Sequence, residues 1–315
     1  MSGAEDTLLL ARTNPHERDA RVRFDPEEHK YYVDGAKYPG SVSGLIHDYF
    51  PHFDGPAVVE ASYAKWAANK ENKYNPLIGY LKNVVGLDDE LVKGEIVRSW
   101  SALGAKASGD GTDTHLQIEL ALNGEEHAAQ SPEFRQFQAW RATHPTWQPY
   151  RTEWSVFDEE ALICGQIDSV WRDERDGRFY MVDWKRVKEM KTEAFRGERG
   201  YEPFHELQNT NRSHYVLQQS AYTWMLEKHY GLAVEKMFLV QVHPDLPSFV
   251  EHELPRMTDE VAVVMARRAR RVKEGTLAAA PPGAAPAEPQ RKRKTDEERR
   301  DKLAKHLQKL LSELS

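Results

Sequence analysis

The sequence predicts an α/β fold, and the order of its elements is the main reason. Residues 151–185 read as three consecutive strands, at 152–158, 162–171 and 179–184, because polar and apolar residues alternate or apolar runs end at turn signals such as Asp176-Gly177. Helical patterns precede and follow this run, and a further apolar strand is predicted at 234–244. Between residues 109 and 244 the order is therefore helix, three strands, helix, strand.

Composition limits the class of protein. With 315 residues, 40% of them hydrophobic, the chain can bury a sizeable core. The formal net charge of -7 does not by itself indicate a nucleic-acid-binding protein, which would need a local basic track instead. The single cysteine, Cys164, excludes a disulfide framework and an iron–sulfur cluster held by four thiolates of this chain.

The N-terminal third is predicted in two parts. Residues 1–20 are expected to be flexible and contain no secretory signal, and no segment approaches transmembrane length. We therefore expect a soluble intracellular protein with no membrane contact, in the cytoplasm or nucleus, with the mitochondrion left open. Region 21–108 begins with a β-hairpin at 21–38 and a short helix at 44–49, whose preceding hydroxyls, Ser41 and Ser43, either cap that helix or contact a phosphate. Three helices are expected at 57–70, 76–86 and 88–108.

A new helix is predicted to begin at Thr112 or Asp113, because Gly109 and Gly111 interrupt the helical pattern. His115 and Glu119 are four residues apart on this helix, so they share one face. The next helix, 132–143, carries an aromatic stripe that is expected to be core.

Two acids interrupt the apolar strands. Asp168 stands inside the second strand and Asp183 near the end of the third. Buried carboxylates are costly unless a positive group satisfies them, and a divalent cation held by both would do so. Lys185 lies two residues after Asp183 and thus on the same strand face, where its ammonium could activate a water or neutralise a phosphate.

The pattern of Asp168, one hairpin and then Asp183-x-Lys185 resembles the PD-(D/E)XK nuclease superfamily. Gly111-Thr112-x-x-His115-x-x-x-Glu119 is similar to the first motif of its RecB-like branch, and Gln218-x-x-x-Tyr222 to an additional motif of that branch. The resemblance implies a restriction-endonuclease-like core at 109–275, with a mixed central sheet flanked by helices and a metal site where the second and third strands diverge.

The resemblance also implies the roles of the site residues. Mg²⁺ or Mn²⁺ would be held by His115, Asp168, Asp183 and the backbone carbonyl of Trp184, while Lys185 positions the water, and Gln218 and Tyr222 align Lys185 with the scissile phosphate. Glu153 is either an auxiliary ligand or part of an edge-strand salt bridge. Glu119 is either a further ligand or an exposed helical glutamate.

The expected function is a nuclease that hydrolyses phosphodiester bonds, most simply a DNA exonuclease of repair, recombination or replication. A structure-selective endonuclease, or a non-catalytic nucleic-acid-binding or assembly protein with the same fold, stays open. Arg186 and Lys188 directly follow the catalytic strand and are candidates for phosphate contact. The polar stretch that continues from there, with Phe195, Tyr201 and Phe204 interleaved, suits single-stranded nucleic acid or is a solvated insertion.

The C-terminal part is predicted as an Ala/Pro linker, 276–290, followed by a basic amphipathic helix, 291–315. An isolated helix of this length is marginal in water. We therefore expect it to bind a partner protein, another copy of the chain or nucleic acid.

Overall fold

The computed structural model describes residues 9–26, 28–125 and 131–278. These residues divide into two compact units, one made of 9–52 and 111–278 and the other of 53–110. The predicted basic helix at 291–315 and most of the predicted linker lie outside the described residues.

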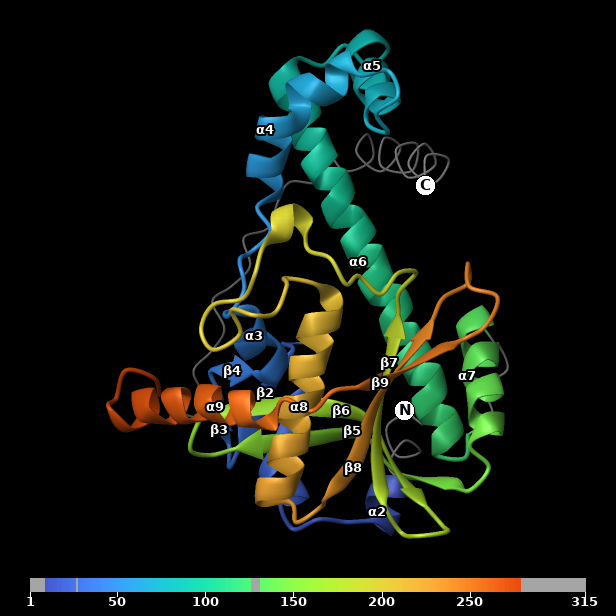
Figure 1. Ribbon diagram of the computed structural model, residues 1–315, viewed down its shortest axis with the longest axis vertical. Coiled ribbons are helices and arrows are strands. Elements are labelled where there is room, and N and C mark those ends of the chain that lie inside the picture. Colours follow the sequence, from blue (N-terminus) through green and yellow to red (C-terminus); the bar gives the residue numbers. More distant parts are fainter. Residues whose placement is uncertain (1–8, 27, 126–130, 279–315) are drawn as a thin grey trace. The chain divides into compact units, whose positions relative to one another are not determined.

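The first unit is built on a six-stranded mixed sheet, which confirms the predicted fold class (Figure 1). Strand β6 pairs in parallel with β4, and β7 pairs in parallel with β8, whereas the pairs β5–β6, β6–β7 and β8–β9 are antiparallel. The strands are β4 (Gly40–Ser41), β5 (Trp147–Asp158), β6 (Ile163–Asp173), β7 (Phe179–Arg186), β8 (Val234–Val242) and β9 (Val250–Leu254).

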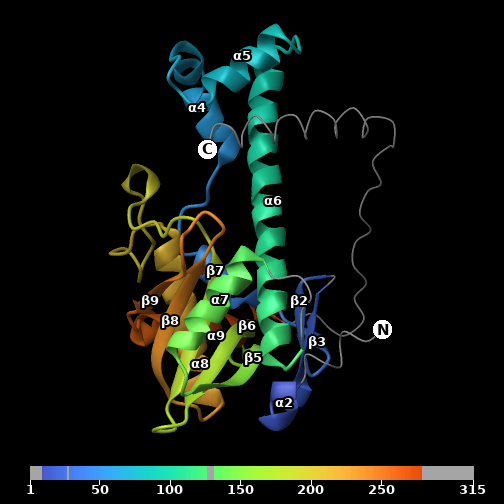
Figure 2. The same ribbon diagram turned by 90° about the vertical axis from the view of Figure 1, so that its right-hand side faces the viewer.

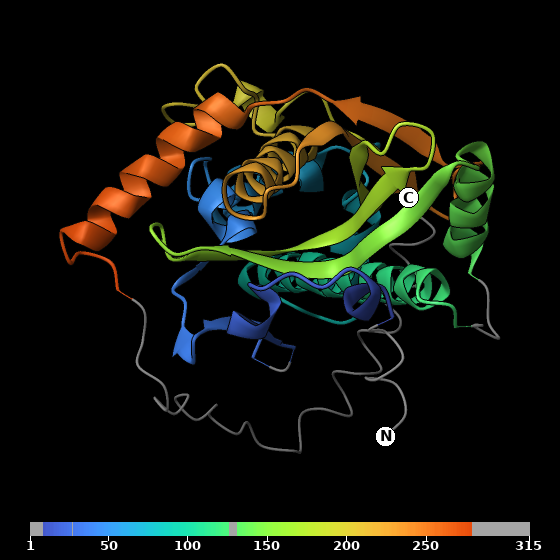
Figure 3. The same ribbon diagram turned by 90° about the horizontal axis from the view of Figure 1, so that it is seen from below.

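Helices cover both faces of this sheet (Figure 3). Helices α3 (Val42–His47), α8 (Asn211–His229) and α9 (Thr258–Lys273) pack on one face around a core that includes Ile167 and Leu239. Helix α7 (Pro132–Thr143) and the last turns of α6 (Asp89–Leu122) pack on the other face, where Trp140 and Trp184 are buried. The aromatic stripe of α7 is therefore core, as predicted.

The predicted N-terminal hairpin is present as β1 (Val22–Asp25) and β2 (Lys30–Val33), extended by β3 (Ala36–Lys37) into a small sheet. Part of the stretch predicted to be flexible is held on the first unit: helix α2 (Leu9–Thr13) and the 3₁₀ turn η1 (Asp19–Arg21) precede the hairpin. The backbone N–H of Leu10 donates to Asn123 Oδ1 at 3.0 Å, and Arg151 Nη1 lies 2.8 Å from Asp19 Oδ2. These contacts hold residues 9–21 on the first unit, so its regular structure begins before the hairpin.

The second unit is helical, as predicted for this region (Figure 2). It contains α4 (Gly55–Ala68), α5 (Asn75–Asn83) and the first part of α6 (Asp89–Leu122), around a core that includes Val59, Leu81 and Ile96. Asp54 caps α4, because its Oδ1 accepts from the N–H of Ala57 at 2.9 Å.

Two sequence expectations are wrong. The predicted helix start at Thr112 or Asp113 does not exist, because α6 runs unbroken from Asp89 to Leu122. A glycine inside a helix costs only about 1 kcal/mol relative to alanine, so Gly109 and Gly111 weaken the helix without ending it. The helical pattern at 257–274 predicts that the arginines of α9 face outward, but Arg268 is buried, and its Nε donates to the carbonyl of Ala161 at 2.8 Å.

Candidate active site

The site lies where β6 loses one of its neighbours. On the edge of β6 that faces β7, the register with β7 covers Ser169 to Arg172, and the short β4 pairs with Ile163 and Cys164. Among the described strands, residues 165–168 of β6 therefore have no ladder partner on this edge. Asp168 stands at the end of this gap, at the point where the second and third predicted strands diverge.

Three side chains from three elements converge on the gap. His115 comes from α6, Glu153 from β5 and Asp168 from β6, and their possible ligand atoms all lie within 4.8 Å of one another. His115 Nδ1 is 3.5 Å from Asp168 Oδ2 and 3.7 Å from Glu153 Oε1. All three side chains are half-buried, so a small ion could reach them.

The orientation of His115 leaves the right atom available for a cation. Its Nε2 lies 2.8 Å from the carbonyl oxygen of Trp184, which can only accept, so Nε2 carries the proton and Nδ1 faces the acids. Histidine ligands in metal sites commonly donate their other N–H to a carbonyl in this way. The Trp184 carbonyl, expected as a ligand, thus braces His115 here.

Glu153 occupies a strained position. Its φ is +43°, which is rare for a residue with a Cβ and uncommon within a strand. Such strain costs on the order of 1–3 kcal/mol and persists when surrounding contacts enforce it. The pairs on either side, Thr152 with Ser169 and Trp154 with Ile167, keep the register, so the strain is local to the residue opposite Asp168.

Asp183 and Lys185 form a second group beside the first. Lys185 Nζ lies 2.8 Å from both carboxylate oxygens of Asp183 and 3.9 Å from Asp168 Oδ2. Asp168 Oδ2 also accepts from the backbone N–H of Trp184 at 2.9 Å. The ammonium therefore sits between the two acids that the sequence pattern pairs.

Asp183 has a partner that sequence reasoning did not identify. Gln219 Nε2 donates to Asp183 Oδ1 at 2.7 Å, and both side chains are buried. The predicted neighbour Gln218 instead donates to the Tyr222 hydroxyl at 3.2 Å. The sequence contained a signal for the role of Gln219, because Tyr215, Gln219 and Tyr222 stand at positions i, i+4 and i+7 and so share one face of α8.

Tyr222 reaches the gap because residue 165 is a glycine. A Cβ added at Gly165 would lie 2.4 Å from Tyr222 Cε1, closer than any real contact. The glycine of the Gly165-Gln166-Ile167-Asp168 pattern therefore lets the ring of Tyr222 pack directly on the backbone of β6.

The site has more acidic side chains than the nearby positive charges can neutralise. Burial and the neighbouring Glu153 and Glu125 raise the pKa of Glu119 to about 7. Burial and Asp168 also raise the pKa of Asp183, against the opposing effect of Lys185. For His115, burial lowers the pKa, but Asp168 and Glu153 outweigh burial and raise it to about 9.

The donor set fits a divalent cation. Carboxylate oxygens are the ligands preferred by Mg²⁺ and Mn²⁺, and an imidazole nitrogen suits Mn²⁺ and other first-row metals. The residues that would hold the ion are His115, Glu153 and Asp168, with Glu119 one helical turn from His115. Asp183, which the sequence also predicts as a ligand, lies outside this group of three, and its carboxylate contacts Lys185; its role as a ligand stays a prediction.

The residues predicted to contact nucleic acid are in different situations. Arg186 Nε is 2.6 Å from Glu133 Oε1 in a largely buried pair, and Lys188 Nζ is 3.1 Å from Asp245 Oδ2 at the surface. Ser41 caps α3, because its Oγ accepts from the N–H of Gly44 at 3.1 Å, and it lies 3.2 Å from Ser43 Oγ. These contacts occupy Arg186 and Ser41 within the protein.

Comparison with known proteins finds a matching family model and similar solved structures. The sequence model of the PD-(D/E)XK nuclease superfamily matches residues 62–315. No curated protein matches the chain. Among solved structures, SSO0001 is similar at 17% identity over 65% of this chain and 73% of its own, with a TM-score of 0.27. A candidate exonuclease from Eubacterium rectale is similar at 13% identity over 73% of this chain and 97% of its own, with a TM-score of 0.30.

Proposed function

The chain belongs to the PD-(D/E)XK nuclease superfamily, and we propose that it is a Mg²⁺- or Mn²⁺-dependent DNA exonuclease that acts in repair, recombination or replication. The observation that carries the proposal is the convergence of His115, Glu153 and Asp168 within 4.8 Å of one another, with an ammonium alongside. The RecB-like motifs around His115 and around Gln218 and Tyr222 favour action at DNA ends.

His115, Glu153 and Asp168 would hold the cation through one nitrogen and two carboxylate oxygens. When bound, a divalent metal polarises the phosphoryl group and lowers the pKa of a water molecule. The backbone helps to set this arrangement, because the carbonyl and the N–H of Trp184 bind His115 and Asp168 respectively. A single residue of β7 thus orients two of the three ligands.

Lys185 supplies a fixed positive charge. Asp183 lies 2.8 Å from its Nζ, and Gln219 in turn holds Asp183. The pKa of Lys185 is raised because the attraction of Asp183 and Asp168 outweighs the effect of burial. The lysine is therefore an ammonium at neutral pH, placed to donate to a phosphate oxygen or to an attacking water and to stabilise the charge that develops.

The test compares the purified full chain with Lys185→Met on end-labelled linear single- and double-stranded DNA, RNA and closed circular DNA, with Mg²⁺ or Mn²⁺. We expect linear DNA to be shortened from its ends and circles to stay intact. Loss of one group that stabilises developing charge typically lowers the rate by about 10²–10³-fold, and we expect that range for Lys185→Met. Lys228→Met, on α8 but outside the site, is the matched control and should keep full activity.

Three results would count against the proposal. Cutting of closed circles would identify an endonuclease instead. Digestion of RNA alone would exclude DNA as the substrate. Equal digestion by wild type and Lys185→Met, or none by either, would remove the assigned role of Lys185.

A further inference from the structure

The segment 187–210, here called the aromatic loop, joins β7 and α8, two of the elements that carry the site. It leaves β7 directly after Lys185 and Arg186, and it ends at the first turn of α8, the helix of Gln219 and Tyr222 (Figure 1, yellow). Its beginning and end are tied together, because Asn211 Oδ1 accepts from the N–H of Lys191 at 2.9 Å. The loop therefore stands at the end of β7 where Lys185 lies.

The aromatic loop is anchored to the core of the first unit. Phe204 is 1% exposed, and its ring stacks on Phe50 with 6.3 Å between ring centroids. The N–H of Tyr201 donates to the carbonyl of Tyr49 at 2.7 Å, and Asn209 Nδ2 donates to the carbonyl of Pro51 at 2.9 Å. These long-range contacts distinguish it from a solvated insertion.

The loop is also braced internally. Gln208 Oε1 accepts from the N–H of Ala194 at 2.7 Å, and the carbonyl of Glu198 accepts from the N–H of Asn209 at 2.8 Å. Gln241 of β8 donates to the carbonyls of Val187 and Lys188, both at 3.1 Å. Side chains on such a frame keep a defined position at low entropic cost.

Two large aromatic side chains on this frame face solvent. Phe195 is 55% exposed and Tyr201 is 54% exposed, although the same loop buries Phe204 completely. The guanidinium of Arg196 lies 5.0 Å from the centroid of the Phe195 ring, and the backbone of Arg196 has a φ of +56°. The loop thus holds the Phe195 ring and the Arg196 guanidinium together at a residue whose backbone conformation is unfavourable for a side chain with a Cβ.

The loop offers one basic group to an anionic ligand. Residues 187–210 carry four Lys or Arg residues and five Glu residues, so the loop as a whole is not basic and its individual cations have to be considered. Lys188 and Arg199 face carboxylates of Asp245 and Glu206, but among the described residues Arg196 has no ion-pair partner. A free guanidinium beside an exposed ring is the pairing that binds a base together with its phosphate.

We propose that the aromatic loop binds single-stranded nucleic acid. Phe195 and Tyr201 would form a stacking platform, here called the platform, for unpaired bases, and Arg196 would contact the strand beside Phe195. The faces of bases inside a duplex are already covered by their neighbours, so only an unstacked strand can offer them to these rings. This inference rests on the proposed nuclease function, and it names the form of the substrate that reaches the site.

The test measures binding of the full chain to a fluorescent 20-mer of deoxythymidine by anisotropy, in EDTA so that no cleavage occurs. Matched probes are a 20-mer of uridine, a duplex of equal length and an abasic 20-mer that keeps the phosphates without the bases. Stacking on one base is lost in Phe195→Ala and Tyr201→Ala, each of which should weaken binding to the deoxythymidine 20-mer about tenfold. Phe195→Trp should bind like wild type, and binding to the abasic strand should be the same in all variants.

Val263→Ala, a truncation of an exposed apolar side chain on α9, is the matched control and should bind like wild type. A tenfold loss with the uridine 20-mer as well would extend the platform to RNA. Equal binding by wild type and Phe195→Ala, an equal loss on the abasic strand, or wild-type affinity for the duplex as high as for the single strand would overturn the platform.

The two proposals can fail separately. If wild type digests DNA but binding does not depend on Phe195 and Tyr201, the platform is wrong and the nuclease assignment stands. If binding depends on these rings but no nucleic acid is digested, the platform stands and the nuclease assignment is wrong.

Discussion

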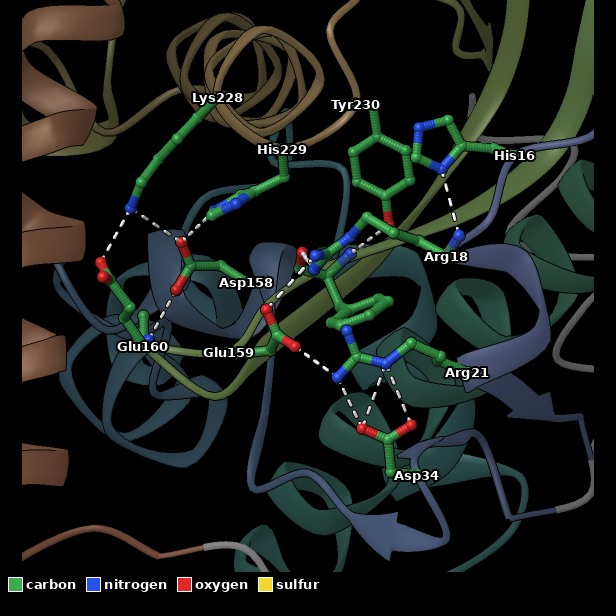
Figure 4. A network of polar contacts seen from close by, with 12 residues as sticks. His16, Arg18, Arg21, Asp34, Asp158, Glu159, Glu160, Lys228, His229 and Tyr230 are labelled. Carbon is green, nitrogen blue, oxygen red and sulfur yellow. Dashed lines mark hydrogen bonds and ion pairs between the residues drawn. The ribbon is translucent and has the colours of Figure 1, made fainter.

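Two groups of charged side chains lie along the β5–β6 hairpin, and their charge balance differs. The first group, the acid centre, consists of Glu119, Glu153, Asp168 and Asp183 with His115 and Lys185. The second, the turn network, surrounds the β5–β6 turn and is drawn in Figure 4; its acids are Asp158, Glu159, Glu160 and Asp34, and its bases are Arg18, Arg21, Lys228 and His229. Glu153 of the acid centre and Asp158 of the turn network are five residues apart on β5, which corresponds to roughly 17 Å along the strand.

In the turn network each acid has a basic partner. Asp158 is 1% exposed, and its Oδ2 lies 2.7 Å from His229 Nε2 and 3.3 Å from Lys228 Nζ. Glu159 binds Arg18 at 3.2 Å and also pairs with Arg21. Burial alone would raise the pKa of Asp158 and of Glu159, yet these partners lower both below their ordinary values.

In the acid centre the balance is reversed, since the pKa values of Glu119 and Asp183 are raised. A compensated carboxylate stabilises the fold, whereas a carboxylate crowded by others reduces stability until a cation arrives. In this protein an excess of acids, rather than buried charge as such, therefore distinguishes the candidate metal site from the structural network.

The largest effect should come from Asp158→Asn. The amide oxygen can still accept from the N–H of Ala161, as Asp158 Oδ1 does at 2.6 Å, but the charge opposite His229 and Lys228 is lost. Breaking a buried pair costs about 3 kcal/mol, which should appear as a drop of several degrees in Tm by calorimetry. Glu160→Gln, at the exposed partner of Lys228, should change Tm little. An unchanged Tm for Asp158→Asn would show that the network does not support the fold.

The same pair makes stability depend on pH. Because the folded-state pKa of Asp158 is lowered, its contribution is present above the unfolded-state pKa of about 3.9 and is lost as the pH falls through the folded value. Denaturant titrations of wild type at pH 7 and below pH 4 should therefore show a loss of stability on the acid side, and Asp158→Asn should show a smaller one.

Asp168→Asn, unlike Asp158→Asn, should not lower the Tm. In EDTA the amide oxygen can still accept from the N–H of Trp184 and the crowding of carboxylates is relieved, so Tm should equal or exceed that of wild type. With Mn²⁺ at ten times its Kd, wild type should gain about 1.4 kcal/mol, because the ion binds the folded state. Asp168→Asn should lose this gain and Asp158→Asn should keep it. A metal-induced shift that survives in Asp168→Asn would place the ion elsewhere.

The smallest effect concerns the strain at Glu153. Glycine adopts a positive φ without penalty, so Glu153→Gly should be more stable than Glu153→Ala by about 1 kcal/mol. At Ser155, in the same strand but with a negative φ, alanine should be the more stable replacement. Chemical denaturation of the four variants measures both differences. If alanine were also better at residue 153, the positive φ would not be a real source of strain.

Much of the fold was predictable because it depends on local patterns. The strands from β5 to β8 and the helices α7, α8 and α9 follow apolar periods and turn residues that act over a few positions. The unbroken course of α6 was not predictable, because Gly109 and Gly111 are compatible both with a break and with a weakened continuous helix. The burial of Arg268 was not predictable either, since its partner, the carbonyl of Ala161, is 107 residues away.

No described helix is long and apolar enough to cross a membrane. The predicted compartment and the role of the C-terminal helix stay predictions.

The sequence by itself determined the order of elements, the family pattern of Asp168, Asp183 and Lys185, and the fact that one strand places Asp183 and Lys185 together, because side-chain direction alternates along any strand. Only the tertiary structure decided that Nδ1 of His115 faces the acids, that Glu153 takes a strained φ opposite Asp168, and that Gln219 holds Asp183. These features depend on how two helices and three strands pack together, and the residues next to each position in the sequence do not encode that packing.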